Sequence, residues 1–220
     1  WIGDTHCPLM KRGYVDFLLD VKREYRCNRV FHIGDLADWT TMSYHEKDLD
    51  LYSPKEERRR AKRQIQTLYK AFPKLEILEG NHDALPFRTA RTFEISSELI
   101  KDHNAIWDTP KWRWHPRHAV IDYGGYLAAH GDRGKQGMYS GIKNAKENFM
   151  SYVQGHHHSL GFCHWYACER DLIFGLQTGC GIDWKHAAME YGLVFNAKPV
   201  LGCGVVFGDG AEGYFVPWRY

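Results

Sequence analysis

The 220-residue sequence lacks the features by which membrane-spanning and secreted proteins are recognised. A membrane-spanning helix needs a run of about 18 apolar residues, and no segment of this chain is that long and apolar. A signal-like apolar stretch and an Asn-x-Ser/Thr glycosylation site are also missing. We therefore expect a cytoplasmic protein with no membrane partner. The chain begins at Trp1 rather than Met, and we expect its first strand to be truncated there.

Neither one sign of charge nor a cysteine framework dominates the composition. The chain has 29 basic and 27 acidic residues, so no overall electrostatic field favours nucleic acid or an anionic membrane. The six cysteines are scattered, and a chain of this length buries enough apolar surface to fold without disulfides. We expect all six thiols to be reduced, and partners must be inferred from local features.

No low-complexity linker or internal repeat divides the chain, so we expect a single domain over residues 1–220. In the first half, short apolar segments alternate with helical patterns and end at polar residues, which predicts a parallel sheet. Ser53-Pro54 supplies the cap and first-turn proline of a helix. The expected helices are 10–27 and 53–72, and the expected strands are 29–33 and 75–78. Residues 39–52 show no clear period and are expected to cross the mouth of the site.

After about residue 110 the pattern becomes strand-like. Gly124-Gly125 between two apolar segments predicts a hairpin, and one helix is expected at 139–150. Further antiparallel strands are expected at 152–154, 162–167, 172–177, 200–207 and 214–216, with a turn at 208–210. The predicted fold class is therefore α/β, a two-sheet mixed β-sandwich flanked by helices.

Polar clusters rich in Asp, His and Asn recur at the ends of apolar segments, and the chain has 13 histidines. The clusters are Asp4-Thr5-His6, Gly34-Asp35-Leu36-Ala37-Asp38, Gly80-Asn81-His82-Asp83, His130-Gly131-Asp132 and Gly155-His156-His157-His158. Parallel sheets place their ligands outside the carboxyl ends of the strands, so these clusters are expected to meet. Together they predict a metal site.

Two divalent ions held about 3.5–4 Å apart repel each other unless an anion lies between them. Asp35 is the natural bridging carboxylate because it ends a central strand, and Asp4 and His6 can turn toward one ion together. The neutral candidate ligands are Asn81, His130, His156 and His158. Two divalent ions outweigh two carboxylates and a hydroxide, and the residual positive charge suits an anionic phosphoryl group.

The ordered set Asp-x-His, Gly-Asp-x-x-Asp, Gly-Asn-His-Asp, His and Gly-His-x-His resembles the calcineurin-like metallophosphoesterase family, with all five motifs in order from Asp4 to His158. The resemblance implies a four-layer αββα fold and two ions. One ion would be bound by Asp4, His6, Asp35 and His158, and the other by Asp35, Asn81, His130 and His156. His82 would then be no ligand but would contact the phosphate and protonate the leaving oxygen. Asp38 would orient His82, with Asp83 the less favoured candidate for that role.

Departures from the family pattern bear on substrate. Protein Ser/Thr phosphatases have an Arg where this chain has Trp39, so that branch is disfavoured. Trp39 could stack on a base or sugar, but packing is favoured. Arg133 lies in a glycine-rich stretch and could grip a phosphate oxygen, or the stretch could be a solvated loop. Residues Trp107, Trp112 and Trp114 lie near Lys111 and Arg113, a pattern that suits single-stranded nucleic acid or a protein interface.

The sequence thus predicts a hydrolase of phosphomono- or phosphodiesters, in which a metal-bridging hydroxide attacks and His82 assists the leaving group. Mn²⁺ is the expected metal, although these ligands also accept Fe, Zn, Co or Ni. A DNA or RNA nuclease of the same family is the alternative, and a metal-bearing scaffold that binds a protein is a third interpretation. The phosphoester substrate is the expected partner, with nucleic acid as the alternative, and nothing in the sequence predicts an oligomeric state.

Overall fold

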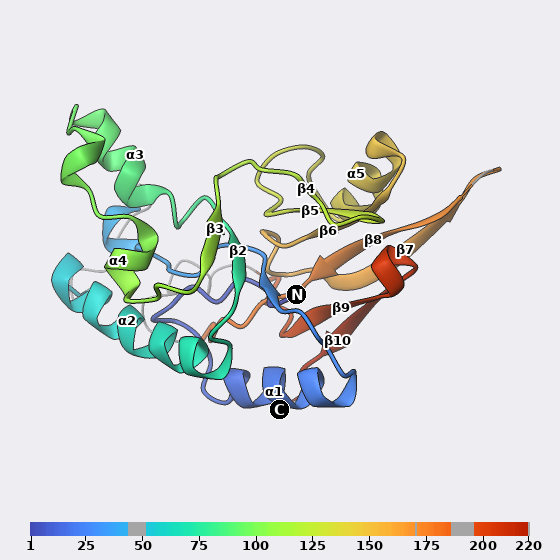
Figure 1. The fold of residues 1–220 in the computed structure, drawn as a ribbon, viewed down its shortest axis with the longest axis horizontal. Coiled ribbons are helices and arrows are strands. Elements are labelled where there is room, and N and C mark those ends of the chain that lie inside the picture. The colour runs from blue at the N-terminus through green and yellow to red at the C-terminus, as the bar shows by residue number, and fades with distance from the viewer. Residues whose placement is uncertain (44–51, 170, 186–195, 220) are drawn as a thin grey trace.

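Two β-sheets with helices on their outer faces make up the described part of the chain (Figure 1). The computed structural model describes residues 1–43, 52–169, 171–185 and 196–219. In Figure 1, helices α1 and α2 lie along one side of the molecule, and α5 lies over the sheet on the other side. The prediction of a two-sheet α/β fold flanked by helices is confirmed.

The first sheet is built on three short parallel strands. They are β1 (Phe31–His32), β2 (Glu76–Leu78) and β3 (Arg113–His115), paired in that order. Ile2 bridges His32 in parallel and Cys203 in antiparallel orientation, so the start of the chain lies between β1 and a hairpin. The hairpin consists of β9 (Gly202–Phe207) and β10 (Glu212–Pro217). The parallel sheet predicted for the first half of the chain is therefore confirmed.

The second sheet has the order β4-β5-β6-β8-β7. Its strands are β4 (Ile121–Asp122), β5 (Tyr126–Ala129), β6 (Ser151–Gln154), β7 (Gly161–Ala167) and β8 (Leu172–Thr178). The predicted hairpin at Gly124-Gly125 is confirmed, because β4 and β5 are antiparallel. The expectation of antiparallel strands throughout was wrong at the centre, where β5, β6 and β8 run parallel. Helix α5 crosses from β5 to β6, and such a crossover returns the chain in the same direction.

Three of the five described helices were predicted from the sequence, and two were not. The helices are α1 (Tyr14–Glu24), α2 (Pro54–Ala71), α3 (Leu85–Thr92), α4 (His103–Trp107) and α5 (Ser140–Asn148), with 3₁₀ turns η1 (Thr40–Met42), η2 (Ser97–Leu99) and η4 (Gly208–Gly210). Helices α1, α2 and α5 were predicted within a few residues of their ends. Helices α3 and α4 were not predicted, because 8 and 5 residues are too few to establish a helical period.

Helix α2 shows how local sequence sets an element. Ser53 Oγ accepts a hydrogen bond from the backbone N–H of Glu56, and Pro54 occupies the first turn, as predicted. The face formed by Ala61, Ile65 and Leu68 is buried in the core. This face holds the helix against the first sheet, whose loops carry part of the site.

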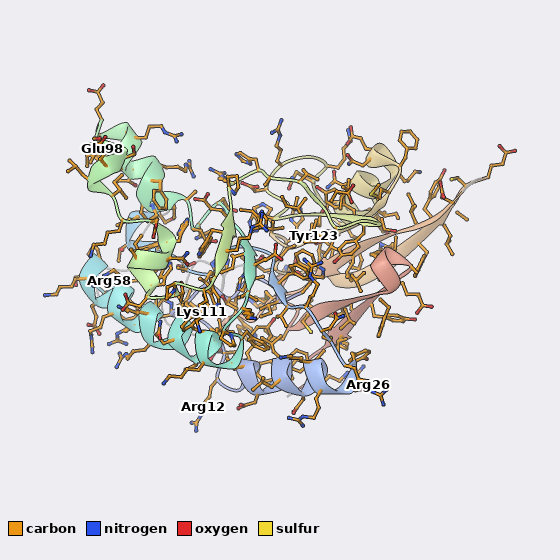
Figure 2. All side chains as sticks on the ribbon, viewed as in Figure 1. Arg12, Arg26, Arg58, Glu98, Lys111 and Tyr123 are labelled. Atoms are coloured by element: carbon orange, nitrogen blue, oxygen red, sulfur yellow. The ribbon has the colours of Figure 1, made fainter. Side chains whose placement is uncertain are left out.

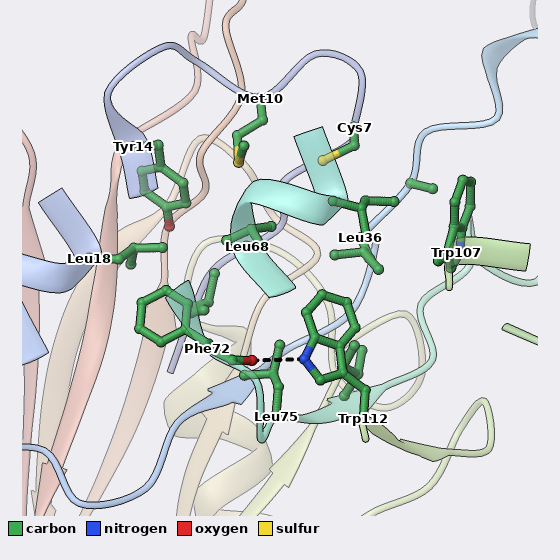
Figure 3. Packing of buried hydrophobic residues seen from close by; sticks show 14 of the residues in the cluster. Cys7, Met10, Tyr14, Leu18, Leu36, Leu68, Phe72, Leu75, Trp107 and Trp112 are labelled. Atoms are coloured by element: carbon green, nitrogen blue, oxygen red, sulfur yellow. Dashed lines mark hydrogen bonds between the residues drawn. The ribbon is translucent and has the colours of Figure 1, made fainter. Parts of the chain in front are cut away.

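Trp107 and Trp112 lie inside the core beneath α2 (Figure 3). They are only 1% and 3% exposed, and Trp112 Nε1 donates to the carbonyl oxygen of Phe72 at 2.8 Å. Trp114 stacks on the ring of His103, with centroids 3.9 Å apart. The prediction that these tryptophans form a platform for nucleic acid or a protein partner was therefore wrong, since their rings are occupied by intramolecular packing.

All six cysteines lie among the described residues and are free thiols, as expected from their spacing. No helix in the described ranges is long and apolar enough to cross a membrane. The segment 39–52, expected at the mouth of the site, begins with buried Trp39 and the η1 turn. Residues 44–51 of that segment lie outside the described part of the chain.

Candidate metal centre

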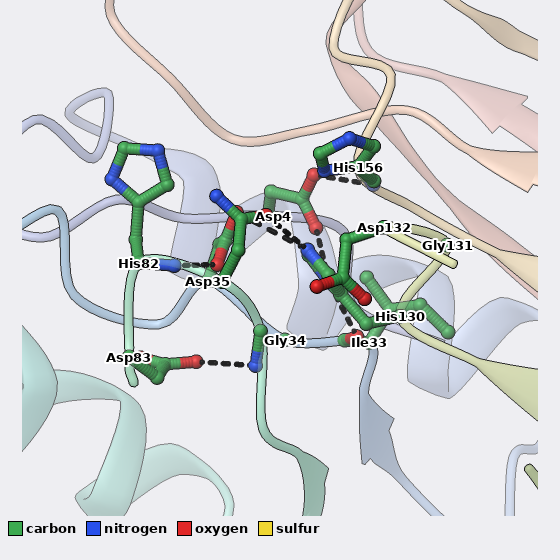
Figure 4. Close-up of polar contacts among 12 residues, drawn as sticks. Asp4, Ile33, Gly34, Asp35, His82, Asp83, His130, Gly131, Asp132 and His156 are labelled. Atoms are coloured by element: carbon green, nitrogen blue, oxygen red, sulfur yellow. Dashed lines mark hydrogen bonds and ion pairs between the residues drawn. The ribbon is translucent and has the colours of Figure 1, made fainter. Parts of the chain in front are cut away.

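The predicted ligands lie in loops that follow strands of both sheets, and Figure 4 shows four of them, Asp4, Asp35, His130 and His156, close together. Asp35 follows β1, Asn81 follows β2, His130 follows β5 and His156 follows β6. Asp4 forms a bridge with Cys180 at the start of the chain. Segments separated by about 150 residues in sequence therefore converge, because the carboxyl ends of strands from both sheets lead into these loops.

Six of the predicted ligands fall into two groups that share the Asp35 carboxylate, and His6, Asp38 and His82 form a third group that could hold an ion. The first group is Asp4, His6, Asp35 and His158, and the second is Asp35, His130 and His156. Within each group, one ligand atom from every residue lies within 4.8 Å of the others. Asn81 Oδ1 lies 3.1 Å from His130 Nε2, which places the amide oxygen beside the second group. The structure thus brings together all seven residues that the sequence singled out as ligands.

The ring nitrogens of His6 and His130 are oriented for ligation through Nε2. His6 Nδ1 is 2.6 Å from Asp38 Oδ1, and His130 Nδ1 is 3.1 Å from the carbonyl oxygen of Ile33. The opposite Nε2 atoms lie 3.5 Å and 3.3 Å from Asp35 Oδ2. A metal-binding histidine characteristically donates its other ring N–H to a carboxylate or carbonyl in this way, which fixes the tautomer and the ring plane.

Two carboxylate oxygens at the centre have no hydrogen-bond donor among the described residues. They are Asp4 Oδ1 and Asp35 Oδ2, and both are buried. A buried polar atom left without a partner typically costs about 1–3 kcal/mol, and more when it is charged. The Nε2 atoms of His6 and His158 also face each other at 3.0 Å, so two nitrogen atoms point to one place. Oxygen and nitrogen atoms converging without donors fit bound divalent cations.

The titration behaviour of the centre agrees with this fit. Burial opposes ionisation of Asp35, but the positive charge of neighbouring histidines, chiefly His130, holds its pKa well below the usual range. Burial likewise opposes a charged His130, but Asp35 outweighs it and raises the pKa of His130 to about 10. Burial lowers the pKa of His156 to about 4. Metal ligands must be unprotonated. A bound cation would therefore replace the proton on His130 as the positive charge that balances the Asp35 carboxylate.

Two motif glycines are needed because ligand carboxylates occupy the space of a side chain. A Cβ on Gly80 would lie 2.1 Å from Asp35 Oδ1, and one on Gly155 would lie 2.4 Å from Ile33 Cγ2 and 2.6 Å from Asp4 Oδ1. The ligands themselves are held in strained backbone, with φ of 46° at His6, 50° at Asp35 and 67° at His156. Such left-handed conformations cost about 1–3 kcal/mol each and cluster at functional sites.

The expected link between Asp38 and His82 is made by a different atom. His82 Nδ1 lies 2.7 Å from the backbone carbonyl oxygen of Asp38 and 3.4 Å from its carboxylate. The Asp38 carboxylate instead contacts His6 Nδ1 and accepts a bond from Thr40 Oγ1. Because a carbonyl only accepts, His82 Nδ1 carries the proton of this bond, and Nε2 is the ring nitrogen left for other work.

Asp83 does not contact His82 but clamps two ligand loops together. Its carboxylate is fully buried and accepts bonds from the backbone N–H groups of Leu36, Ala37 and Gly80 at 3.2, 3.1 and 3.1 Å. It thereby ties the loop after β1, which carries Asp35, to the loop after β2, which carries Asn81. Asp83 is therefore the residue of the Gly-Asn-His-Asp motif that fixes the backbone of the two ligand loops by hydrogen bonds.

The sequence model of the calcineurin-like phosphoesterase family matches residues 1–195, which include every residue of the two ligand groups. The chain belongs to this family. No curated protein matches the chain in a separate sequence comparison. Membership in the calcineurin-like phosphoesterases supports metal-dependent hydrolysis of phosphoesters, and the two ligand groups are candidate sites for the divalent ions.

Two residues expected to bind substrate differ in their placement in this calcineurin-like phosphoesterase. Trp39 is 5% exposed and packs against Trp107 with ring centroids 5.2 Å apart, so it has no face free for a ligand and the packing interpretation holds. Arg133 is exposed and borders a cavity of about 460 Å³ that His130 also lines. Of the two, only Arg133 is exposed, and it shares this cavity with a predicted metal ligand.

The sequence did not predict the role of Glu57, which supports the site of this calcineurin-like phosphoesterase. Glu57 of α2 accepts bonds from the backbone N–H groups of Thr40 at 2.6 Å and Thr41 at 3.1 Å, so it anchors the turn that follows Asp38. Its place within a charged helix gave no signal, because acidic residues in a first turn normally stay in solvent.

Proposed function

We propose that this calcineurin-like phosphoesterase hydrolyses phosphomono- or phosphodiesters at a centre of two divalent ions. The observation that carries the proposal is the pair of ligand groups joined by Asp35. Asp35 Oδ2 is buried without a hydrogen-bond donor among the described residues and faces both His6 and His130. A carboxylate oxygen in that position suits a ligand shared by two cations.

Each ion has a proposed set of ligands. Asp4, His6, Asp35 and His158 would hold one ion, and Asp35, Asn81, His130 and His156 the other. We expect Mn²⁺, since nitrogen and oxygen ligands of this kind accept it readily. A pair of divalent ions supplies charge neutralisation for phosphoryl oxygens and activation of a water nucleophile.

His82 is the proposed proton donor to the leaving oxygen. Its backbone N–H donates to Asp35 Oδ1 at 2.8 Å, which fixes the residue next to the ligand groups. Its ring is 19% exposed, and with Nδ1 committed to the Asp38 carbonyl, the proton that reaches substrate comes from Nε2. Asp38 is therefore proposed to position two histidines, His6 through its carboxylate and His82 through its carbonyl.

Replacing His82 tests this role. His82→Ala is expected to lower kcat on an unactivated phosphodiester by about 10²–10⁴, because the general acid is lost. On an activated p-nitrophenyl ester the loss should be much smaller, since that leaving group departs without a proton. His164→Ala is the control, because His164 lies on β7, two strands from β6. Equal losses on both substrates would contradict a proton-donor role.

The nuclease alternative loses its strongest sequence support, because Trp107 and Trp112 are buried. It remains the second proposal for the substrate, as cleavage of nucleic acid is also phosphodiester hydrolysis. A panel of monoesters, diesters, nucleotides and oligonucleotides offered to the Mn²⁺-loaded enzyme separates the two. The absence of oligonucleotide cleavage beside turnover of small esters excludes a nuclease. No turnover of any ester with any divalent ion would favour the scaffold interpretation.

A further inference from the structure

A second hollow lies at the edge of the first sheet opposite the metal centre. The cavity has a volume of about 650 Å³ and is lined where the three parallel strands begin. Its walls come from residues 28–30 before β1, residues 72–76 leading into β2, Lys111 and Arg113 at the start of β3, and Lys22 of α1. The metal ligands follow the carboxyl ends of β1 and β2, so the two sites lie at opposite edges of the sheet. Figure 2 shows Lys111 near the amino ends of β2 and β3.

The charge around this cavity is strongly one-sided. Five of its lining residues are cationic, and Glu76 is its single acid. The cations are Lys22, Arg29, Lys74, Lys111 and Arg113. The resulting local excess of positive charge is larger than the +2 of the entire chain. A surface whose charges were placed only for solubility would be expected to mix the two signs.

Most of these cations have no ionic partner. Arg29 pairs with Glu76 at 3.0 Å, and Glu76 is also bound by His115 at 3.0 Å, so this carboxylate is fully used. Within the described ranges, Lys22, Lys74, Lys111 and Arg113 form no ion pair. Like charges that converge without counter-ions repel each other, and a bound anion relieves that repulsion.

The shape of the cavity limits what the anion can be. Its inner surface includes the apolar side chains of Val30, Phe72 and Leu75, and Lys22 Nζ lies 5.8 Å from the centre of the Phe72 ring. The lining thus combines exposed cations with the buried apolar side chains of Phe72 and Leu75. A volume of about 650 Å³ falls within the range of about 300–1,000 Å³ typical of small-molecule sites.

We propose that this cavity binds a small anion carrying two or more phosphate groups, at a site separate from the metal centre. Exposed lysine ammonium groups act as mobile point charges that can adjust to several phosphate oxygens. Arg113 adds a fork that can hold one phosphate through two parallel hydrogen bonds. The site does not depend on the proposed catalytic function, since none of its lining residues belongs to the ligand groups.

The test is calorimetric titration of the full chain with inorganic tripolyphosphate at low and at physiological salt. The Lys74→Glu/Lys111→Glu variant is expected to bind at least about tenfold more weakly than the unchanged protein, because two attractive charges become repulsive. The corresponding double Gln variant should fall between them. Lys55→Glu is the matched control, because Lys55 lies on α2 about 25 Å along the helix from Phe72. Any binding at the metal centre is common to all variants and cancels in the comparison.

Two further measurements decide among outcomes. Turnover of a small ester should be unchanged in the Glu and Gln variants, which separates this site from the catalytic proposal, and unchanged thermal unfolding without ligand shows that the variants fold. Binding of tripolyphosphate that is equal in the unchanged protein and the Glu variant, or absent from both, overturns the proposal. Binding of a single-stranded oligonucleotide through the same lysines, without binding of tripolyphosphate, also overturns it and assigns the surface to a polymer.

Discussion

At the scale of the residue, the two oxygens of Asp35 have separate tasks. Oδ1 accepts the backbone N–H of His82 at 2.8 Å, whereas Oδ2 has no hydrogen-bond donor and faces the Nε2 atoms of His6 and His130. One carboxylate therefore sets the position of the proposed proton donor and offers an oxygen to the cations. Movement of Asp35 should disturb both functions together.

Gly80→Ala tests how closely Asp35 must be held. The added Cβ would lie 2.1 Å from Asp35 Oδ1, so the carboxylate or the loop has to shift. We expect the variant to bind fewer than two metal ions per chain and to lose most of its phosphoesterase activity, measured by metal analysis and by ester turnover. Gly137→Ala is the control, since its φ of +87° makes alanine strained there but nothing lies within 4 Å of the new Cβ. Full metal content in Gly80→Ala would contradict the account.

At the scale of the element, α5 is joined to the site by a chain of buried amides. Gln154, at the end of β6, accepts from Asn144 Nδ2 at 2.7 Å and donates to Ser140 Oγ at 3.0 Å. Asn144 Oδ1 in turn accepts the backbone N–H of Lys135 at 2.8 Å. The helix thus holds both the loop that carries Arg133 and the strand that leads into His156.

Gln154→Leu is expected to weaken this connection without opening a large cavity. The substitution removes the shorter of two bonds from Asn144 Nδ2 and leaves the 3.3 Å bond to the Lys135 carbonyl oxygen, and losing a buried hydrogen-bond partner typically costs about 1–3 kcal/mol in the free energy of unfolding. Urea denaturation of the metal-loaded protein measures the cost, and metal titration should show weaker binding because Gly155-His156 follows directly. The exposed Gln136 is the control, where Leu should cost less than about 1 kcal/mol. A Gln154→Leu variant with unchanged stability and metal affinity would show that the amides do not support the site.

Elements and site residues were predictable to different degrees. The ligands were predicted because the motif residues follow strands. The carboxyl ends of parallel strands lie at the same edge of a sheet, whatever path the connections between the strands take. The parallel centre of the second sheet was missed because the sequence located α5 but not the strands that it connects. The contact between the Asp38 carbonyl oxygen and His82 could not be predicted, because every residue has a backbone carbonyl and the sequence does not indicate which one accepts a bond. The prediction of a binding surface at Trp107 and Trp112 was wrong because both side chains are buried. Alternating aromatic and basic residues give the same sequence pattern at the edge of a core and on a binding surface.

At the scale of the whole molecule, the first sheet separates two sites with different electrostatics. Its carboxyl edge presents carboxylates and imidazoles suited to cations, and its amino edge presents five cations suited to anions. The cationic cavity escaped the sequence analysis because Lys22, Lys74 and Lys111 are about 35 to 50 residues apart in sequence. Only the parallel order of β1, β2 and β3 brings the segments before these strands together.

The most direct test of the account is a metal titration of the full chain compared with its Asp35→Asn variant. With Mn²⁺ we predict that the unchanged protein binds two ions per chain and gains phosphoesterase activity, because the two ligand groups share Asp35. The variant should bind at most one ion with comparable affinity and lose activity. Binding of a single ion by the unchanged protein, or of two ions with unaltered affinity by the variant, would contradict the shared-carboxylate centre.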